Sequence, residues 1–565
     1  MGAVGTSGPD TPTGAARGVD ADDTVVTGVT LRAQEVVAGD LFAALPGSRV
    51  HGATFAAQAV DRGAAAILTD PDGAEVLATT VFASAGVSVP VLVHDRPRDV
   101  LGEISSTIYG DPSRVLTLVG VTGTAGKTTT SYLVESGLFA AGHRAGLIGT
   151  VETRIDGRRT PSALTTPEAP DLQALLAVMV ERGVDTVVME VSSHALSLGR
   201  VDGCTFAAAG FTNLSQDHLD FHRDMDDYFS AKSRLFAPGS GARAARAVVC
   251  VDDDWGRRMA RIGRSDPALP TATVTIGQDA AAEWHAGTSE VDDLGVQRFV
   301  VRDPRGHDVP VTLPLPGRFN AANALVALGL LEAVGIDVDT ASRGLAAVSV
   351  PGRLERVDCG QQFLAVVDYA HKPAAVDAVI ATLRAQSAGR LAVVVGAGGD
   401  RDAGKRPLMG AVAARGADLV VVTDDNPRTE DPGRIRTAVL DGALGRDGSP
   451  AGPHDEPLRE SRPRVIDEGD RAAAIGLAIA WAEPGDTVLV AGKGHETGQE
   501  IDGVKHPFDD RDVVAAAIER RADFSRGADA EAAKTGTPPG TQTAKTETAA
   551  DTGTSEATAG NEGDE

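Results

Sequence analysis

The amino-acid sequence predicts an α/β protein with three domains and disordered ends. Its 565 residues are enough for three or four domains at roughly 100 to 200 residues each. Short apolar runs of strand length alternate with helical patterns along most of the chain, which is typical of parallel sheets covered by helices. A glycine-rich segment directly follows one of these runs, as in sheets that bind nucleotides.

Changes in composition and turn residues mark the expected boundaries. Pro112 and Ser113 separate the first unit from the second, and Pro351 and Gly352 separate the second from the third. Both ends are rich in Gly, Ala, Thr and acidic residues and have no aromatic side chains, so they cannot bury enough apolar surface to fold. The expected segments are a disordered N-terminal segment at 1–22, a small α/β domain at 23–114, a parallel-sheet domain at 115–350, a second doubly wound domain at 351–524 and a disordered acidic tail at 525–565.

Each domain contains apolar runs of the length expected for buried strands. The expected strands of the first domain are 64–68 and 89–93, with a helix at 57–62. The expected strands of the second domain are 115–121, 185–191, 207–212 and 247–251, with a helix at 171–182. The expected strands of the third domain are 363–368, 391–395, 419–423 and 487–490, with a helix at 374–384.

The charge balance narrows the classes of partner. The chain carries 53 Lys and Arg against 79 Asp and Glu, a formal net charge of -26, which opposes binding to a nucleic-acid backbone. No apolar run approaches the roughly 18 to 20 residues that cross a bilayer, and the first residues lack the pattern of a secretory signal. The three cysteines are far apart and suit a reducing compartment. We therefore expect a cytoplasmic protein with no nucleic-acid partner and no membrane insertion.

The glycine-rich segment lies between the run 115–121 and a helix expected from about Thr128. Its glycines let backbone N–H groups surround phosphate oxygens, and the helix N-terminus adds a partial positive charge. Lys127 would reach the terminal phosphates, and Thr128 would offer its hydroxyl to Mg²⁺. Val121 stands where the strict spacing G-x-x-x-x-G-K-[ST] has its first glycine, so an ordinary glycine-rich turn is the alternative. The expected nucleotide contacts are Gly123, Thr124, Ala125, Gly126, Lys127, Thr128 and Thr129.

Acidic and histidine side chains follow two of the expected strands. Glu190 comes at the end of the run 185–191, where ligands of open α/β sheets gather, and a carboxylate there can hold Mg²⁺. His194 suits a structural role as well as a ligand role. The segment 212–222 contains two histidines and two aspartates, which could ligate a metal, handle phosphate or form loop hydrogen bonds. Lys232, taken by itself, is expected at the surface.

Seven segments together closely resemble the Mur ligases, and they occur in the family's order between about residues 25 and 515. The segments are 123–128, 165–167, 190–194, 217–220 together with Lys232, 316–320, 368–371 and 425–428. Because several independent motifs match, the resemblance is specific. It implies an N-terminal UDP-substrate domain, a central P-loop ATPase domain on a parallel sheet, and a C-terminal Rossmann-like domain that binds the incoming amino acid.

The resemblance also implies an activity. Such enzymes are ATP-dependent ligases that use Mg²⁺ and join a carboxylate to an amine through an acyl phosphate. The motif at 425–428 is similar to that of the members that add meso-diaminopimelate to UDP-N-acetylmuramoyl-L-alanyl-D-glutamate in peptidoglycan synthesis, which supports cell shape and division. We expect a monomer. The alternatives are a ligase that adds L-lysine, a nucleotide-binding regulatory paralogue, and a folylpolyglutamate synthetase, for which this motif would have no purpose.

Four residues carry the catalytic and metal-binding roles that the resemblance implies. Thr128 and Glu190 would hold one Mg²⁺, and His218 would serve a second metal position together with Lys232. The lysine would be carbamylated, as N6-carboxylysine, which replaces a cation with an anion that can bind Mg²⁺. Lys127, Lys232, His218 and Glu190 are the implied catalytic residues.

Further matching positions imply contacts with the three substrates. Those for ATP are Asn320, Arg353, Asp368 and His371. Those for the UDP-substrate are Leu31, Thr165, Thr166, Ser192 and Arg200. Those for the amino acid are Arg401, Asp425, Asn426, Pro427, Arg428, Gly492 and Glu496. Arg428 and Arg401 would pair with the distal carboxylate of diaminopimelate, which lysine lacks. Two places depart from the family's pattern, because Arg32-Ala33-Gln34 stand where Asp-Ser-Arg is common and Ala125 stands where Asn is usual.

Overall fold

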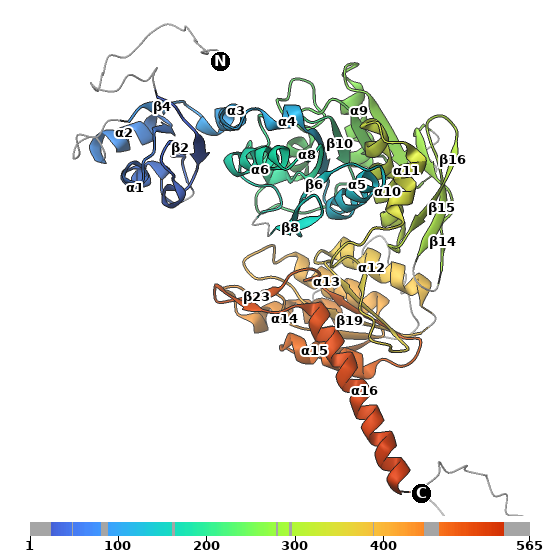
Figure 1. Ribbon diagram of the computed structural model, residues 1–565. Helices are drawn as coiled ribbons and strands as arrows, with labels where there is room; N and C mark the ends of the chain where they lie inside the picture. The colour runs from blue at the N-terminus through green and yellow to red at the C-terminus, as the bar shows by residue number, and fades with distance from the viewer. Residues whose placement is uncertain are drawn as a thin grey trace, which may run out of the picture. The chain divides into compact units, whose positions relative to one another are not determined.

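The computed structural model describes residues 24–47, 49–80, 89–160, 164–277, 281–292, 296–387, 389–445 and 463–535. Within these ranges the chain forms sheets of four, twelve and six strands and a two-stranded hairpin (Figure 1). The predicted α/β architecture is confirmed. The predicted disordered segment 1–22 and the part of the predicted tail from 536 onward lie outside the described residues. Contacts divide the chain into a unit Met1–Ile518, which holds all four sheets, and a unit Glu519–Glu565.

The first sheet is small and entirely parallel. Its strands, in spatial order, are β1 (Gly28–Thr30), β2 (Asp40–Ala43), β3 (Ala66–Thr69) and β4 (Val91–Val93). Its helices are η2 (Ala33–Glu35), η3 (Gly52–Phe55), α1 (Ala56–Asp61), α2 (Pro71–Thr80) and α3 (Pro97–Ile108). Successive strand residues point to opposite faces, so Leu41 packs with Leu101 of α3 while Phe42 joins the cluster that contains Leu77 of α2. Helices therefore cover both faces of this sheet.

The central sheet is parallel in its middle and antiparallel at both edges. Its spatial order is β14-β15-β13-β12-β11-β10-β5-β9-β6-β7-β8, with β16 beside β15. The strands are β5 (Thr117–Thr122), β6 (Ala145–Ile148), β7 (Thr153–Ile155), β8 (Arg158–Thr160), β9 (Thr186–Glu190), β10 (Ala208–Phe211), β11 (Ala247–Cys250), β12 (Thr271–Thr275), β13 (Trp284–Ala286), β14 (Glu290–Val291), β15 (Gln297–Arg302) and β16 (Asp308–Leu313). The helices are α4 (Pro112–Val115), α5 (Lys127–Ala140), α6 (Ala169–Glu181), α7 (Ser193–Ser197), α8 (Met225–Ser233), α9 (Asp254–Arg264), α10 (Arg318–Ala333) and α11 (Val338–Leu345).

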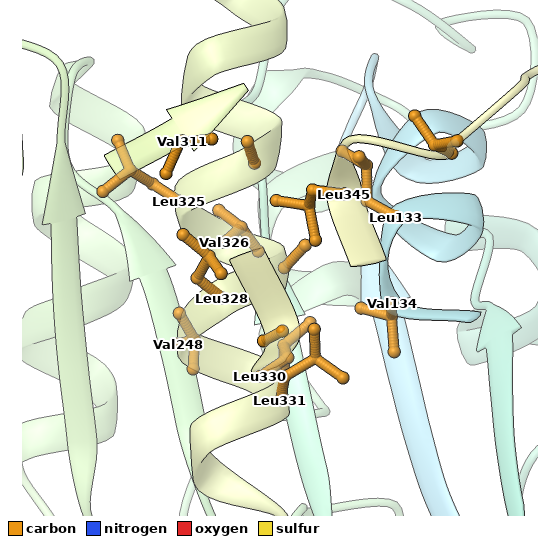
Figure 2. Close-up of a cluster of buried hydrophobic side chains, with 14 of the residues drawn as sticks. Leu133, Val134, Val248, Val311, Leu325, Val326, Leu328, Leu330, Leu331 and Leu345 are labelled. Atoms are coloured by element: carbon orange, nitrogen blue, oxygen red, sulfur yellow. The ribbon is translucent and has the colours of Figure 1, made fainter. Parts of the chain in front are cut away.

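Aliphatic residues fill the space on each face of this sheet. Figure 2 shows Leu133 of α5, Leu330 of α10 and Leu345 of α11 converging with Val248 of β11 on one face. The opposite face buries a separate cluster that includes Leu176 of α6 and residues of α8 and α9. The middle strands are apolar on both faces because helices cover both, which explains why the sequence shows them as continuous apolar runs.

The third sheet repeats the parallel pattern. Its spatial order is β17 (Glu355–Arg356), β18 (Leu364–Asp368), β22 (Thr487–Ala491), β19 (Leu391–Val395), β20 (Leu419–Val422) and β21 (Arg464–Asp467), and only β17 is antiparallel. Its helices are α12 (Pro373–Gln386), α13 (Lys405–Gly416), α14 (Pro432–Ala443), α15 (Arg471–Trp481) and α16 (Asp510–Thr535), and β23 (Gly498–Ile501) pairs with β24 (Val504–Pro507) as the hairpin. No described helix is long and apolar enough to span a bilayer.

Two expectations about individual strands were wrong or incomplete. The predicted strand 115–121 begins too early, because Pro112 starts the short helix α4 and Val115 is its last residue. Strand β15, which pairs with β13 and β14 on one side and with β16 on the other, was missed because its residues alternate between buried and exposed instead of forming an apolar run. Helix α16 runs from Asp510 to Thr535 and so crosses residue 524, where the third domain is expected to end. The domain boundaries at 115, 351 and 524 stay predictions.

Candidate active site

The phosphate loop follows β5 and leads into α5, as its sequence predicts. Gly123 and Gly126 have φ angles of +148° and +86°, conformations that glycine adopts without strain. A Cβ atom on Gly126 would lie 2.3 Å from Oδ1 of Asn323, and one on Gly123 would lie 2.0 Å from Oγ1 of Thr212. Both positions therefore need glycine for conformation and for space.

Neighbouring loops hold the phosphate loop in place. The backbone N–H of Thr124 donates to the carbonyl of Asn213 at 2.9 Å, and the N–H of Ala125 donates to Oδ1 of Asn213 at 3.0 Å. Oγ1 of Thr212 donates to the carbonyl of Ala125 at 2.6 Å. Because β10 lies directly beside β5, the segment after β10 reaches the loop, so one part of the polar segment 212–222 forms loop hydrogen bonds. Ala125 takes part through its backbone alone.

Two lysines point at the carbonyls of this loop. Nζ of Lys127 donates to the carbonyls of Gly123 and Thr124 at 3.0 Å and 3.1 Å, and Nζ of Lys232 donates to the carbonyl of Gly123 at 2.9 Å. The expectation that Lys232 lies at the surface was wrong, because its exposed fraction is 1%. Burial lowers the pKa of Lys127 to about 8. Burial and the nearby charge of Lys127 lower the pKa of Lys232 well below its usual value.

Glu190 is the last residue of β9 and is 1% exposed. Its Oε1 accepts hydrogen bonds from Oγ1 of Thr128 at 3.0 Å and from the N–H of Thr150 at 2.8 Å. Its Oε2 accepts from Oγ1 of Thr150 at 3.0 Å. Glu190 is therefore a buried carboxylate with three hydrogen-bond donors beside the phosphate loop. Sequence reasoning missed Thr150, which follows β6, the neighbour of β9. Its place after an apolar strand was the one available indication.

His218 lies in the loop after β10 with a φ angle of +54°, in the left-handed region that side chains other than glycine seldom adopt. Its Nε2 is 3.0 Å from Oδ2 of Asp217, and its ring centroid is 4.8 Å from that of His194. Burial lowers the pKa of His218 to about 3, which leaves the ring neutral. The Tyr228 ring links it to Lys232, because the Tyr228 centroid is 6.0 Å from that of His218 and 4.7 Å from Nζ of Lys232.

The expected ATP contacts from the third sheet meet the phosphate loop through Arg353. Its Nη2 donates to Oγ1 of Thr128 at 3.3 Å, and its guanidinium lies 4.5 Å from the centroid of the Tyr369 ring. Asp368 accepts hydrogen bonds from the N–H groups of Leu354 at 2.7 Å and Ala370 at 2.8 Å. Burial raises the pKa of Asp368. These contacts fix the turn that follows β18.

Two further expected ATP residues, Asn320 and His371, are held in place by hydrogen bonds. Asn320 is 3% exposed, and its Oδ1 accepts from Nδ2 of Asn323 at 3.2 Å. Asn323 in turn lies directly beside Gly126 of the phosphate loop. His371 is fixed by the carbonyl of Tyr369, 2.8 Å from its Nδ1. Burial lowers the pKa of His371 to about 3. The next residue, Lys372, forms an ion pair with Asp217.

Four of the expected UDP-substrate residues are joined by hydrogen bonds around Glu190. Oγ1 of Thr165 is 3.0 Å from Oγ1 of Thr150, and Oγ1 of Thr166 donates to the backbone carbonyl of Glu190 at 2.9 Å. The N–H of Ser192 donates to Oγ1 of Thr166 at 3.1 Å. Nη1 of Arg200 donates to the carbonyl of Thr166 at 3.2 Å. These four residues, which the sequence separates by up to tens of positions, therefore form one hydrogen-bonded group beside Glu190.

The fifth expected UDP-substrate residue, Leu31, lies outside this hydrogen-bonded group. Leu31 packs against the core of the first sheet, beside residues of β1 and α3, and no contact recorded among the described residues joins it to the other four. Its neighbour Arg32 forms ion pairs with Glu35 at 2.5 Å and with Asp171 of α6 at 2.7 Å. The side chain of Arg32 therefore joins the segment after β1 to α6 through exposed ion pairs.

The segment 425–428 forms a compact polar cluster with the turn after β22. Nζ of Lys493 lies 3.4 Å from Oδ1 of Asp425 and donates to Oδ1 of Asn426 at 2.7 Å. Nδ2 of Asn426 donates to Oε2 of Glu496 at 2.9 Å. Burial opposes ionisation of Asp425, yet the charges of Lys493 and Arg471 hold its pKa below the usual value. Burial raises the pKa of Glu496. Sequence reasoning missed Lys493, although it belongs to the same motif as Gly492 and Glu496.

The two arginines expected to bind a carboxylate lie on neighbouring loops. Nη1 of Arg428 donates to the carbonyl of Gly399 at 2.6 Å. Arg401 is exposed and lines a cavity of about 400 Å³ together with Gln216, Leu219, Asp220, Asp400 and Asp402. Asp400 connects the two loops, because its carboxylate accepts hydrogen bonds from the N–H and the hydroxyl of Thr429. The arrangement can present two guanidinium groups to one anionic end of a small molecule.

The arrangement as a whole can hold a polyphosphate beside a carboxylate and an amino acid. Within the described residues, no three His, Cys, Asp or Glu side chains form a ready metal site. Glu190 and Thr128 instead offer two oxygen ligands next to the phosphate loop. Mg²⁺ in nucleotide sites commonly takes one or two protein oxygens together with phosphates and water. The donor set therefore fits Mg²⁺ that arrives with a nucleotide.

Comparisons with known families agree along the chain. The description "Mur ligase family, catalytic domain" matches residues 25–109, "Mur ligase middle domain" matches 121–331 and "Mur ligase, glutamate ligase domain" matches 352–494. The chain is 55% identical over 478 residues to "UDP-N-acetylmuramoyl-L-alanyl-D-glutamate--2,6-diaminopimelate ligase" of Corynebacterium efficiens, covering 85% of this chain and 87% of that protein. It is 52% identical over 496 residues to the protein of the same name from Streptomyces coelicolor, covering 88% and 93%.

Solved structures give the same result. A structure of a protein with that name is 33% identical and has a TM-score of 0.61, covering 88% of this chain and 95% of the other. The MurF ligase from Thermotoga maritima in complex with ADP is 18% identical with a TM-score of 0.57, covering 89% and 99%. The second likeness shows a shared fold.

Proposed function

The chain belongs to the Mur ligase family, and on that premise we propose that it is the ATP-dependent ligase that adds meso-diaminopimelate to UDP-N-acetylmuramoyl-L-alanyl-D-glutamate. The reaction forms a C–N bond in the cytoplasmic synthesis of peptidoglycan precursors, and one chain supplies every residue that the proposal uses. The observation that carries the proposal is the meeting of Lys127, Lys232 and Glu190 at the phosphate loop. Lys127 and Lys232 both donate to the carbonyl of Gly123, and Glu190 accepts from the adjacent Thr128.

The first step activates the side-chain carboxylate of the D-glutamate residue. A carboxylate oxygen attacks the γ-phosphorus of ATP, the bond from that phosphorus to the bridging oxygen breaks, and an acyl phosphate and ADP result. Little covalent chemistry is asked of the protein, so catalysis depends on positioning and on stabilising the charge of the transferring group. Lys127 and the N-terminus of α5 supply positive charge at the loop where the phosphates bind.

Mg²⁺ is part of the proposal. Thr128 and Glu190 would hold it beside the phosphates, where it neutralises charge on the transferring phosphoryl group. The neutral ring of His218 and a carbamate on Lys232 would complete a second position. The low pKa of Lys232 supports carbamate formation, since a free amine can attack the carbon of CO₂, form an N–C bond and release a proton. The resulting anion would replace a buried amine that donates to the carbonyl of Gly123.

The second step forms the amide bond. The amine of diaminopimelate attacks the acyl carbon, phosphate leaves with the electrons of the broken C–O bond, and the nitrogen loses a proton. Gly492 and Glu496 would hold the amino end of the incoming molecule, while Arg428 and Arg401 would pair with its distal carboxylate. L-lysine has no such carboxylate, and a site built to pair a charged group discriminates strongly against an analogue that lacks it.

Phosphate release from the purified chain tests the proposal. With UDP-dipeptide, ATP and Mg²⁺ present, diaminopimelate should start steady release, and omission of any one component should stop it. L-lysine at the same concentration should give a much lower rate. Equal rates with the two amino acids would reject the role of Arg428. No release with any amino acid, while ATP still binds, would reject the ligase and favour a regulatory protein.

A further inference from the structure

The hairpin of β23 and β24 pairs with the segment 425–428, and Glu500 makes three of the contacts. The backbone N–H of Glu500 donates to Oδ1 of Asn426 at 3.0 Å, and its carbonyl accepts from the N–H of Arg428 at 3.0 Å. Its carboxylate Oε2 lies 3.3 Å from Nε of Arg428. The next contact along the hairpin, from the N–H of Asp502 to the carbonyl of Arg428 at 2.6 Å, continues the same pairing. Glu500 thus meets the motif with its N–H, its carbonyl and its side chain.

We propose that Glu500 is a specificity-determining positioning residue, which orients the guanidinium of Arg428 to receive the distal carboxylate of the incoming amino acid. This inference rests on the proposed function and adds a residue that lies outside the motifs of the family resemblance. Glu500 acts through Arg428 and makes no contact with the reacting atoms in this account.

The backbone of Arg428 needs such support. Its φ angle is +53°, and a residue with a Cβ atom rarely holds that conformation unless its surroundings fix it. The two backbone hydrogen bonds to the hairpin supply this constraint. They also set the point from which the side chain starts, so the hairpin decides where the guanidinium can reach.

The guanidinium is held at two of its three nitrogens. Nη1 donates to the carbonyl of Gly399, and Nε faces Glu500. A guanidinium has five N–H groups in a fixed plane, so donors remain for a substrate carboxylate. A long side chain that is already immobilised loses less freedom when it binds, which raises affinity without any new contact.

The charge of the ion pair contributes less to substrate affinity than the orientation of the guanidinium does. The side chains of Arg428 and Glu500 are 23% and 42% exposed, and partly exposed ion pairs are weak because solvent screens them. The charge of Glu500 also opposes the approach of a substrate carboxylate. Orientation and charge therefore predict opposite effects when Glu500 is removed, which makes the two distinguishable.

Kinetics of Glu500→Ala and Glu500→Gln test the proposal. Glu500→Ala should raise KM for diaminopimelate about tenfold, the cost of ordering one long side chain at binding, with kcat changed less than about twofold because the contact is remote from the reacting amine. The rate with L-lysine should stay the same, so the preference for diaminopimelate falls. Glu500→Gln keeps an acceptor for Nε and should recover most of the loss. Asp502→Asn is the matched control, since it removes a charge from the same hairpin at a side chain for which the described contacts include none to Arg428.

A double-mutant cycle shows whether Glu500 acts through Arg428. In an Arg428→Lys background, Glu500→Ala should change kcat/KM for diaminopimelate less than about twofold, because the group that it orients is gone. An unchanged KM in the single variant, a lower KM in both single variants, or an equal loss in both backgrounds would each overturn the proposal. Absence of diaminopimelate-dependent phosphate release in the parent chain would instead reject the proposed function, before any variant is compared.

Discussion

The phosphate loop and the segment 425–428, called the amino-acid region below, are both proposed to bind anions, but their charged side chains have different partners. At the phosphate loop, Nζ of Lys127 and Nζ of Lys232 donate to main-chain carbonyls, and among the described residues neither lysine has a recorded ion pair. At residues 425–428 the charges are already paired. Arg428 faces Glu500, and Lys493 faces Asp425.

This difference assigns different tasks to the two regions. Uncompensated positive charge in a buried site is costly until an anion arrives, so the nucleotide region gains most when a phosphate or a carbamate is present. The amino-acid region exchanges one partner for another, so it gains less from each contact but rejects molecules that cannot replace the lost partner. We therefore expect changes at the phosphate loop to act on turnover and changes at residues 425–428 to act on KM and selectivity.

The largest effect expected is that of Lys232→Ala. It should lower kcat/KM by about a thousandfold, the upper range for loss of one group that stabilises charge in a transition state. A small added carboxylate such as acetate should restore part of the phosphate release by filling the space as an anion. Lys127→Ala is the contrasting variant, because that position needs a cation and acetate should not help. Undiminished activity of Lys232→Ala, or equal rescue of both variants, would reject the carbamate.

A buried glutamate in α5, the helix that begins at the phosphate loop, leads us to expect that stability depends on pH. Glu135 of α5 pairs with Arg154 at 2.8 Å, and burial raises its pKa from 4.5 to about 7. An acid with a raised pKa in the folded state adds stability below its unfolded pKa and loses that stability as the pH rises through the folded value. The free energy of unfolding should therefore fall by up to about 3 kcal/mol between pH 4.5 and 7.5.

Glu135→Gln should flatten this fall, and urea unfolding at several pH values measures it. Glu181→Gln, a change at an exposed glutamate of α6, is the control and should keep the slope of the parent chain. Equal slopes for the parent and Glu135→Gln would contradict the assignment. A flatter slope in Glu135→Gln would show that α5, like the phosphate loop at its start, contains a buried ionisable group whose pKa is shifted.

A smaller effect is expected from Arg428→Lys. Lysine keeps the charge but loses the planar fork, so KM for diaminopimelate should rise roughly thirtyfold with little change in kcat. Steady-state kinetics with varied diaminopimelate checks this. A fall in kcat with an unchanged KM would contradict the separate roles of the two regions, since residues 425–428 would then act on turnover as the phosphate loop does.

The smallest effect is expected from removal of the residues after 524. Val514, Ala517 and Ile518 of α16 are buried against the third sheet, and a chain that ends at residue 524 keeps all three. Its kcat and KM values should match those of the full chain within about twofold, since the change removes no group placed at either loop. A larger loss in kcat would assign a role in turnover to the removed residues.

Local sequence predicts the phosphate loop well because one short segment contains the strand end, the glycines and the lysine. Glu190 is predictable for the same reason, since it ends an apolar run. The role of Lys232 is not predictable in this way, because the sequence of α8 does not indicate that this helix packs against the phosphate loop at Gly123. The contacts of Thr150 with Glu190, and of Glu500 with Arg428, depend on strand neighbours that are distant in sequence. Residue types indicate the chemistry of a site, whereas these pairings come from the packing of the sheets.

A competition experiment tests the central claim most directly. The purified chain receives UDP-dipeptide, ATP and Mg²⁺ with equal concentrations of diaminopimelate and L-lysine, and mass spectrometry identifies the ligated product. We expect nearly all product to carry diaminopimelate, and we expect Arg428→Lys to lower this preference. Product that carries the two amino acids in equal amounts would contradict this expectation.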